Sequence, residues 1–385
     1  MLEPIRFQRP ELPAGAEIER YLAAAREQRW FSNQGPCHRL LTERLAQYLG
    51  GDVSVVLMAN ATLGLVLALR TLLGESPRGS LVIVPSFTFP ATAQAITWNG
   101  LQPLWVDVEP GGWHLDPHAL GEALAAHGAD VAGVLACSTF GTAPPASQSE
   151  AWREACAEAG VPLIVDSAPG FGSSDECGQL LGAQGDAEVF SFHATKPFAI
   201  GEGGAVTTSD RELADHLTAM TNFSFGPDRE VHSPFGLNAK LSEIHAAIGL
   251  AVLDHFDEVL DARRTRAEQM QDELEQAGYR FQTGVRSSTW QFVPVIAPSA
   301  EMRDAVLLLA EERRIEIRSY HAPLHMLPTF ATHPSQTALP VTEDLARRAL
   351  SLPLANDLSE AEIRRILAVL LEGARSRSQP AEVEA

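Results

Sequence analysis

Cysteine is scarce in this chain of 385 residues, and its spacing follows no known motif. Cys37, Cys137, Cys156 and Cys177 include no C-x-x-C pair. The sequence therefore predicts neither a disulfide framework nor a zinc site, and the reducing cytoplasm is the simplest compartment. The histidines are scattered and form no H-x-x-x-H pair on a predicted helix, so we expect no bound metal.

Long apolar runs and basic residues are scarce as well. No stretch reaches the roughly 20 apolar residues of a membrane span, and no basic segment with an apolar run follows Met1, so we expect neither a span nor a signal peptide. The chain has 29 Lys and Arg against 49 Asp and Glu, a formal net charge of −20. This charge argues against partners such as nucleic acid or an anionic membrane, although a local basic pocket can still bind a small anion.

Several motifs of nucleotide-binding and hydrolytic enzymes are missing. There is no Walker P-loop and no G-x-G-x-x-G, and GEGG at 201–204 does not open a helix, so we interpret it as a turn. The chain also lacks the G-x-S-x-G elbow of Ser-His-Asp hydrolases, which argues against that chemistry.

A regular alternation of strands and helices dominates the chain from about residue 53. The strands are short apolar runs without polar alternation, which is typical of a sheet covered on both faces. This order predicts an α/β fold with a mostly parallel sheet flanked by helices and right-handed crossovers. The first predicted strands are 53–58, 80–85, 103–108, 131–137 and 161–166.

The length of the chain favours a large domain followed by a smaller one. Residues 240–275 have the pattern of a long amphipathic helical region. From about 278 a strand, a helix, a strand and two further helices suggest a compact α+β unit. We expect a large domain over 1–260, which includes the N-terminal helices, and a small domain over 261–373. The polar residues 374–385 predict a disordered tail.

Lys196 is the first candidate for chemistry. The apolar strand AEVFSFHA leads into it, and GEGG and a second short strand, AVTTSD, follow. A lysine in apolar surroundings loses part of its preference for the charged form, so its amine can act as a nucleophile in a Schiff base. Most lysines at strand ends are simply solvated, so this pattern decides nothing alone.

Asp166 closes another apolar strand, VPLIVD. A carboxylate there can pair with the protonated ring nitrogen of a pyridine cofactor, or it can be an ordinary turn or cap residue. Asn60, Ala61 and Thr62 open an apolar helix whose amides suit a phosphate, unless Asn60 merely caps the helix. Ligands of such sheets gather at the carboxyl ends of the strands, where all these residues fall.

Ser191 and Phe89 are further candidates at these strand ends. Ser191 lies five residues before Lys196 and can supply another phosphate contact. Phe89 can stack on a flat cofactor, although an ordinary core phenylalanine is the commoner outcome.

The chain resembles the DegT/StrS family of nucleotide-sugar aminotransferases, which are fold-type I pyridoxal-phosphate (PLP) enzymes. Matching segments follow in order over almost the whole chain, from about residue 5 to 372. They include ANATLGLVLALR, VPSFTFPATAQAI, PLIVDSA, SFHATK with GEGGAVTTSD, GLNAKLSEIHAAIG and HAPLHMLPTF. Several motifs in series are far more specific than any one of them.

The resemblance implies PLP as the cofactor and gives each candidate a role. Lys196 would form the Schiff base and move the proton, Asp166 would hold the ring nitrogen, and Phe89 would stack on the ring. The cofactor phosphate would be bound by Ala61, Thr62 and Ser191.

Further roles follow from the same resemblance. Asn238 would reach the phosphate from the partner subunit, which implies a homodimer with shared active sites. Lys240, where many relatives carry arginine, would offer a point charge to a carboxylate or pyrophosphate. Asn33 and His325 look like substrate contacts. Pro169 stands where many relatives have Gln, His or Glu, so any side-chain contact from that position is lost.

The implied reaction moves an amino group from L-glutamate to a keto-sugar nucleotide. WFSNQGP and GLNAKLSE look most like enzymes that aminate C4 of a dTDP-4-keto-6-deoxy-hexose, giving a dTDP-4-amino-4,6-dideoxy sugar. A 3-keto sugar and a keto-cyclitol remain alternatives. A non-catalytic binding or regulatory protein of this fold would be expected to lose Lys196 or Asp166, and dehydrating relatives replace the lysine with histidine. A desulfurase would need a mobile loop cysteine.

Overall fold

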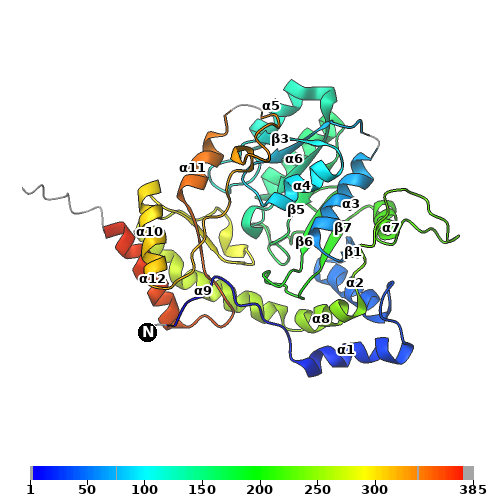
Figure 1. The fold of residues 1–385 in the computed structure, drawn as a ribbon, viewed down its shortest axis with the longest axis horizontal. Helices are drawn as coiled ribbons and strands as arrows, with labels where there is room; N and C mark the ends of the chain where they lie inside the picture. The colour runs from blue at the N-terminus through cyan, green and yellow to red at the C-terminus, as the bar shows by residue number, and fades with distance from the viewer. Residues whose placement is uncertain (1–2, 75, 336–337, 376–385) are drawn as a thin grey trace, which may run out of the picture.

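A seven-stranded sheet forms the centre of the computed structural model, which describes residues 3–74, 76–335 and 338–375 (Figure 1). The strand order is β1-β7-β6-β5-β4-β2-β3. Only β7 runs antiparallel to its neighbours, so the predicted mostly parallel sheet is confirmed. The strands are β1 (Ser54–Met58), β2 (Leu81–Pro85), β3 (Gln102–Val106), β4 (Val131–Cys137), β5 (Leu163–Asp166), β6 (Ala187–Ser191) and β7 (Gly204–Thr208).

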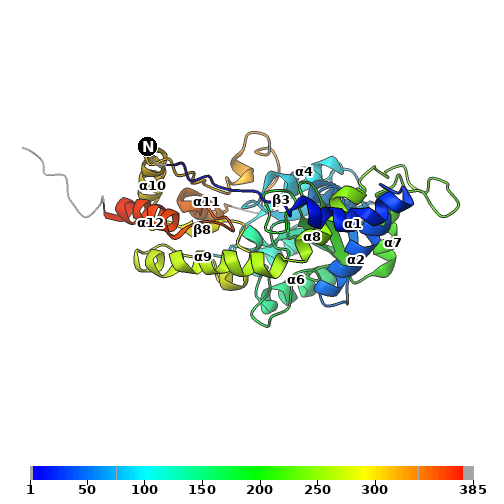
Figure 2. The same cartoon turned by 90° about the horizontal axis from the view of Figure 1, so that it is seen from below.

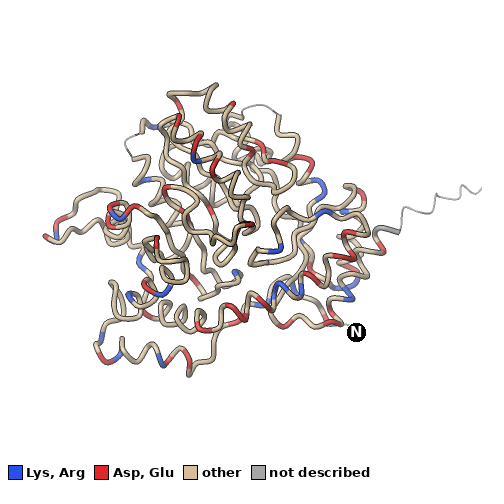
Figure 3. The backbone as a smooth tube through the Cα atoms, turned by 180° about the vertical axis from the view of Figure 1, so that it is seen from behind, with Lys and Arg blue, Asp and Glu red and all other residues tan. Residues whose placement is uncertain are grey.

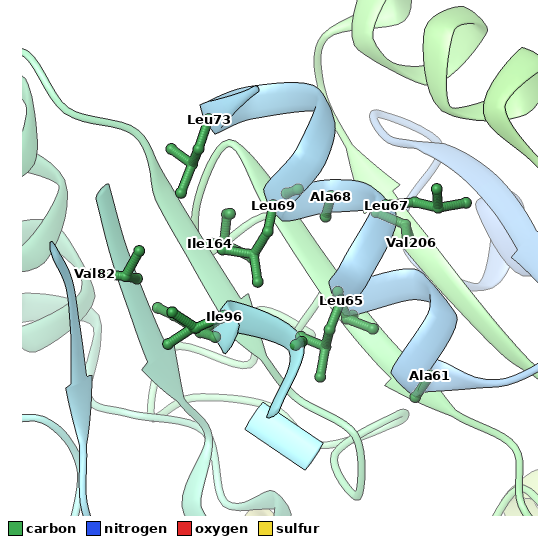
Figure 4. Close-up of a cluster of buried hydrophobic side chains, with 14 of the residues drawn as sticks. Ala61, Leu65, Leu67, Ala68, Leu69, Leu73, Val82, Ile96, Ile164 and Val206 are labelled. Atoms are coloured by element: carbon green, nitrogen blue, oxygen red, sulfur yellow. The ribbon is translucent and has the colours of Figure 1, made fainter. Parts of the chain in front are cut away.

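Helices cover both faces of this sheet, which explains why most residues of its strands are apolar. One face packs against α3 (Ala61–Leu73), α4 (Pro90–Trp98) and α7 (Arg211–Met220). Figure 4 shows residues of α3 and α4 against strand residues such as Val82 and Ile164. The other face packs against α2 (Pro36–Tyr48), α5 (Pro117–His127), α6 (Ala146–Ala159) and α8 (Glu243–Leu253). Outside them, α1 (Gly15–Gln28) contacts α2 and α8.

A second, two-stranded sheet lies in a smaller α+β unit, as predicted. Its strands β8 (Val293–Ile296) and β9 (Ala349–Leu352) are antiparallel. They share an apolar core with α9 (Phe256–Gln276), α10 (Ala300–Glu312) and α12 (Glu360–Arg375), at one end of the molecule in Figure 2. Ile5 near the N-terminus also lies in this core and pairs with Ile315.

The order of elements in this unit differs from the prediction. Here α11 (Pro340–Arg348) precedes β9, so among the described residues a single helix, α12, follows the last strand. The division at 260/261 stays a prediction, and α9 runs across it without a break. The helix α12 ends at Arg375, and the remainder of the predicted tail, 376–385, lies outside the described residues. Short 3₁₀ turns occur at Gly128–Asp130, Thr139–Gly141, Val285–Ser287 and Leu324–Met326.

The helical region expected over 240–275 consists of two helices. These helices, α8 and α9, are separated at Asp254 and His255. The Asp254 carboxylate accepts hydrogen bonds from Tyr21 and Arg44, which ties this break to α1 and α2. A tertiary contact therefore interrupts a pattern that is helical in the sequence.

Acidic residues are spread over the outer helices and loops and do not form one patch (Figure 3). No helix within the described ranges is long and apolar enough to cross a membrane. The described part of the chain also contains no group of three or more His, Cys, Asp or Glu side chains that could hold a metal ion.

Candidate functional site

Lys196 lies in the connection between β6 and β7, at the carboxyl edge of the large sheet. These strands are antiparallel, so the chain turns back at this edge instead of crossing the sheet through a helix. Hydrogen bonds from Phe192 N to Gly203 O and from Ala194 N to Gly201 O close the turn. Gly201 has a φ of +94°, which a side chain would strain.

The amine of Lys196 is surrounded by protein, although the residue as a whole is only half-buried. Its Nζ donates to Oε1 of Gln291 at 3.0 Å. Burial lowers the pKa of Lys196 to about 8, and the negative charge of Asp166 opposes this shift. A substantial fraction of the amine is therefore neutral and nucleophilic near physiological pH.

Asp166 ends β5 on the same edge and is buried. Its Oδ2 accepts from Thr92 Oγ1 at 2.7 Å, and its Oδ1 accepts from Ala168 N at 3.1 Å. Burial raises the pKa of Asp166, whereas Thr92, the Ala168 amide and the charge of Lys196 act in the opposite direction. Such a carboxylate is poised to pair with a cationic group brought into the site.

The start of α3 forms the third part of this edge. Asn60 does cap the helix, since its side chain accepts from Leu63 N at 2.9 Å. The cap leaves the amides of Ala61 and Thr62 for other partners. A Cβ on Gly204 would lie 2.8 Å from Ala61 N, so only glycine lets β7 approach the helix start this closely. A compact anion such as a phosphate fits this arrangement of amides and helix dipole.

Ser191 and Phe89 flank these groups. Ser191 pairs with Gly204 across the two strands, and its Oγ accepts from His193 N at 3.3 Å. Phe89 precedes α4, and its ring is 60% exposed, which is high for a phenylalanine. The reading of Phe89 as an ordinary core residue is therefore wrong, and a free ring face is available for stacking.

His321 interacts electrostatically with the lysine and packs against two aromatic residues. The His321 ring stacks on Phe140, with centroids 4.8 Å apart and an interplanar angle of 9°, and contacts Phe87 edge-on. Burial lowers the pKa of His321 to about 3, and the charge of Lys196 adds to this effect. His321 is thus a neutral neighbour of the amine over the whole physiological range.

Sequence reasoning missed Thr92, Gln291 and His321. Thr92 lies within a segment that was otherwise recognised, and an inward-facing hydroxyl early in α4 was a usable signal. Gln291 is 95 residues from Lys196, and nothing in its local sequence indicates the contact.

The predicted substrate contacts lie in separate places within one chain. Asn33 is exposed in the loop between α1 and α2, where its backbone oxygen accepts from Trp30. Asn238 is exposed and pairs with Asn222. Lys240 donates to Asn222 Oδ1 at 2.7 Å. These contacts are local, so the substrate roles of Asn33 and Lys240 and the phosphate role of Asn238 stay predictions.

His325 and Pro169 are held by neighbouring groups. Nδ1 of His325 lies 2.7 Å from Ser86 Oγ, and its Nε2 lies 3.6 Å from a carboxylate oxygen of Glu343. The carbonyl of Pro169 accepts from Thr289 Oγ1 at 2.7 Å. The backbone at position 169 therefore makes a defined contact although its side chain cannot.

A pocket of about 890 Å³ opens beside the start of α3. Asn60 and Thr62 line one side, and residues 234–237 line the opposite side. The latter belong to residues 222–238, which we call the arm because they project beyond α7 in Figure 1. A ligand whose phosphate lay at the helix start would border this pocket.

Comparison with known proteins agrees with this geometry. The profile of the DegT/DnrJ/EryC1/StrS aminotransferase family matches residues 14–371. The chain belongs to this family. It is similar to protein Rv3402c of Mycobacterium tuberculosis, with 37% identity over 372 residues, 96% of this chain and 90% of that protein.

Two further relatives have more informative names. The dTDP-4-amino-4,6-dideoxy-D-glucose transaminase of Shigella dysenteriae is 28% identical over 385 residues, 97% of this chain and 100% of that protein. The crystal structure of DesI in the presence of its TDP-sugar product superposes with a TM-score of 0.88 at 34% identity. That match covers 98% of this chain and 95% of DesI.

This aminotransferase uses PLP, and its residues fit that group. Each part of PLP has a suitable partner: the aldehyde has the Lys196 amine, and the pyridine nitrogen has the buried Asp166. The ring face has the exposed Phe89, and the phosphate has the amides at the start of α3. PLP would supply an electron-withdrawing ring next to the reacting carbon.

Proposed function

We propose that this sugar aminotransferase moves the amino group of L-glutamate to a keto-sugar nucleotide, at C4 of a dTDP-4-keto-6-deoxy-hexose. The observation that carries the proposal is the Lys196 amine, with its pKa lowered to about 8, beside the buried carboxylate of Asp166. The similarity to the Shigella transaminase and to DesI favours a dTDP-linked sugar amine.

The residues at the sheet edge have separate roles toward the cofactor. Lys196 attaches the cofactor and, once released, accepts and returns the proton at the reacting carbon. Asp166 keeps the ring nitrogen protonated, and Thr92 holds the Asp166 carboxylate in place. Ala61, Thr62 and Ser191 bind the phosphate, and Phe89 packs on the ring face.

We also propose a homodimer whose subunits share active sites, in the cytoplasm. Large apolar side chains are exposed along and next to the arm, which favours burial against a second copy. Trp98 is 79% exposed beside the pocket, and four arm residues are between 44% and 59% exposed. The arm residues are Phe223, Phe225, Val231 and Phe235. At the base of the arm, Asn238 would then reach the cofactor phosphate of the partner, and Lys240 would contact the substrate.

The first half-reaction is tested by absorbance. Purified chain mixed with PLP should develop the visible band of the lysine-linked cofactor, and L-glutamate should convert this band to that of the amine form. Lys196→Ala should lose both changes, and Lys240→Ala, which leaves the cofactor site intact, should keep the first one. An unchanged wild-type spectrum with every amino donor would refute the transaminase proposal.

The second half-reaction identifies the acceptor. Protein loaded with pyridoxamine phosphate is mixed separately with a dTDP-4-keto sugar, a GDP-4-keto sugar, a dTDP-3-keto sugar and a keto-cyclitol. Mass analysis should show a new amine, and NMR its carbon, only with the first compound. Preferred amination of the 3-keto sugar or the cyclitol would reject the C4 assignment and leave the aminotransferase assignment intact.

A further inference from the structure

A buried arginine, Arg263, has only neutral acceptors among its hydrogen bonds. From α9 its guanidinium donates to the backbone oxygens of Trp290 and Gln291, both at 2.9 Å, and to Asn356 Oδ1 at 2.7 Å. Arg263 is 6% exposed. Burying a charge without a counter-ion is unfavourable, so this arginine is expected to serve a purpose other than stability.

The segment that Arg263 holds has a strained backbone. Trp290 has a φ of +53°, a region that bulky residues rarely adopt. Its indole Nε1 is buried and finds no acceptor among the residues that the structure describes. Strained residues of this kind persist where the surrounding structure fixes them, and they cluster at functional sites. Here the strain and the arginine together fix the next residue, Gln291.

Gln291 is the residue that contacts the reacting amine. Its Oε1 accepts from Lys196 Nζ at 3.0 Å, and its side chain is almost fully buried. An amide oxygen accepts from the amine in both its neutral and its protonated form, whereas a carboxylate there would hold the proton. A neutral acceptor therefore supports a lysine that must repeatedly gain and lose a proton.

We propose that Gln291 receives the amine of Lys196 whenever the lysine is released from the cofactor, and that Arg263 is the positioning residue that aims Gln291 at it. The inference rests on the proposed role of Lys196. The lysine then rests in one defined place during the part of the cycle in which the cofactor carries the amino group. From there it transfers the proton and reattaches.

Other titratable groups near the amine have to be considered in any test. Asp166 and His321 interact with it electrostatically, and Arg9 and Glu11 line a small polar cavity of about 30 Å³ beside Lys196 and Arg263. The variants below leave these four groups unchanged. A change in the titration of Lys196 then reports on the acceptor itself.

The test uses the full chain loaded with pyridoxamine phosphate, in which the lysine is free. An amine-reactive acylating reagent is applied over a pH series, and the labelled fraction of Lys196 is measured by peptide mass analysis. Gln291→Leu should lower the midpoint by about one to two pH units, because a hydrogen bond to a charged group is lost. Gln291→Glu should raise the midpoint, and Arg263→Lys should shift it in the same direction as Gln291→Leu.

Gln8→Leu is the matched control, since Gln8 donates to the backbone oxygen of Thr195 but does not contact the amine. Its midpoint should equal that of the wild type. Thermal unfolding verifies that each variant is folded, and the pH profile of the L-glutamate half-reaction should move with the labelling midpoint. Equal midpoints in the wild type, Gln291→Leu and Gln291→Glu, or shifts of the last two in the same direction, would overturn the proposal.

The labelling result separates this inference from the proposed function. A wild type that never reacts with an amino donor would reject the function, whereas the midpoints would still decide whether Gln291 governs Lys196. If Arg263→Lys alone keeps the wild-type midpoint, Arg263 has no positioning role.

Discussion

Replacing Thr92 by valine should weaken catalysis without disturbing the fold. Thr92 Oγ1 lies 2.7 Å from Asp166 Oδ2, and both residues are buried. A hydrogen bond to a charged group contributes about 1.5–3 kcal/mol, so its loss should raise the pKa of Asp166 by about one to two units. We expect the L-glutamate half-reaction to slow by about 10- to 100-fold at neutral pH.

The direction of the pH effect provides a sharper test than the rate. Asp166 is proposed to act as the carboxylate, so activity falls as the pH drops through its pKa. Thr92→Val raises that pKa further, and the acidic limb of the rate profile should move to higher pH by the same one to two units, about 1.4 kcal/mol each. Stopped-flow absorbance of the loaded protein with L-glutamate measures this limb.

Thr97→Val is the matched control, because Thr97 lies on the same helix but donates to Gln94 O at the surface. It should keep the wild-type rate and profile. A Thr92→Val enzyme with an unshifted acidic limb would refute the assignment of Thr92, even if its rate were reduced.

Three further substitutions probe other parts of the structure. Burial holds the folded-state pKa of Asp166 above its unfolded value, so stability is lost as pH rises through the folded-state pKa. Asp166→Asn should therefore raise the melting temperature of cofactor-free protein at neutral pH but not in acid. The same substitution should abolish turnover. Gly204→Ala places a Cβ 2.8 Å from Ala61 N and should weaken PLP binding in a titration by about 1–3 kcal/mol; unchanged affinity would contradict the phosphate site. Glu243 accepts from the first amides of α2, at 2.7 Å from Cys37 N, so Glu243→Gln should cost about 1–2 kcal/mol in denaturant unfolding while the cofactor band persists.

Much of the fold was predictable because its signals are local. The helix predicted to open at Asn60, Ala61 and Thr62 spans Ala61–Leu73 in the structure, since most of its residues are apolar and Asn60 caps it. The strand ends at Asp166 and near Lys196 were predicted for the same reason. The helix α7 was not predicted, although Asp210 caps it and Leu213 and Leu217 face the core.

The remainder of the site depends on contacts between distant segments. Gln291 lies in the strand-like sequence TWQFVPV, and its contacts with Arg263 and Lys196 join segments that are far apart in the chain. The break between α8 and α9 arises in the same way, from contacts of Asp254 with α1 and α2. Residues over 240–275 are helical by pattern, so no local signal marked this break.

The antiparallel strand β7 also decides which parts of the site can move together. Because β6 and β7 pair through Ser191 and Gly204 at the edge where Lys196 emerges, both ends of the lysine loop are anchored to one rigid body with Asp166 and the start of α3. Gln291, however, lies two residues before β8 of the other sheet. A hinge motion between the two sheets would leave the cofactor contacts intact and would change the distance from the amine to its acceptor. The opening and closing of the molecule would thereby control when the amine can transfer its proton.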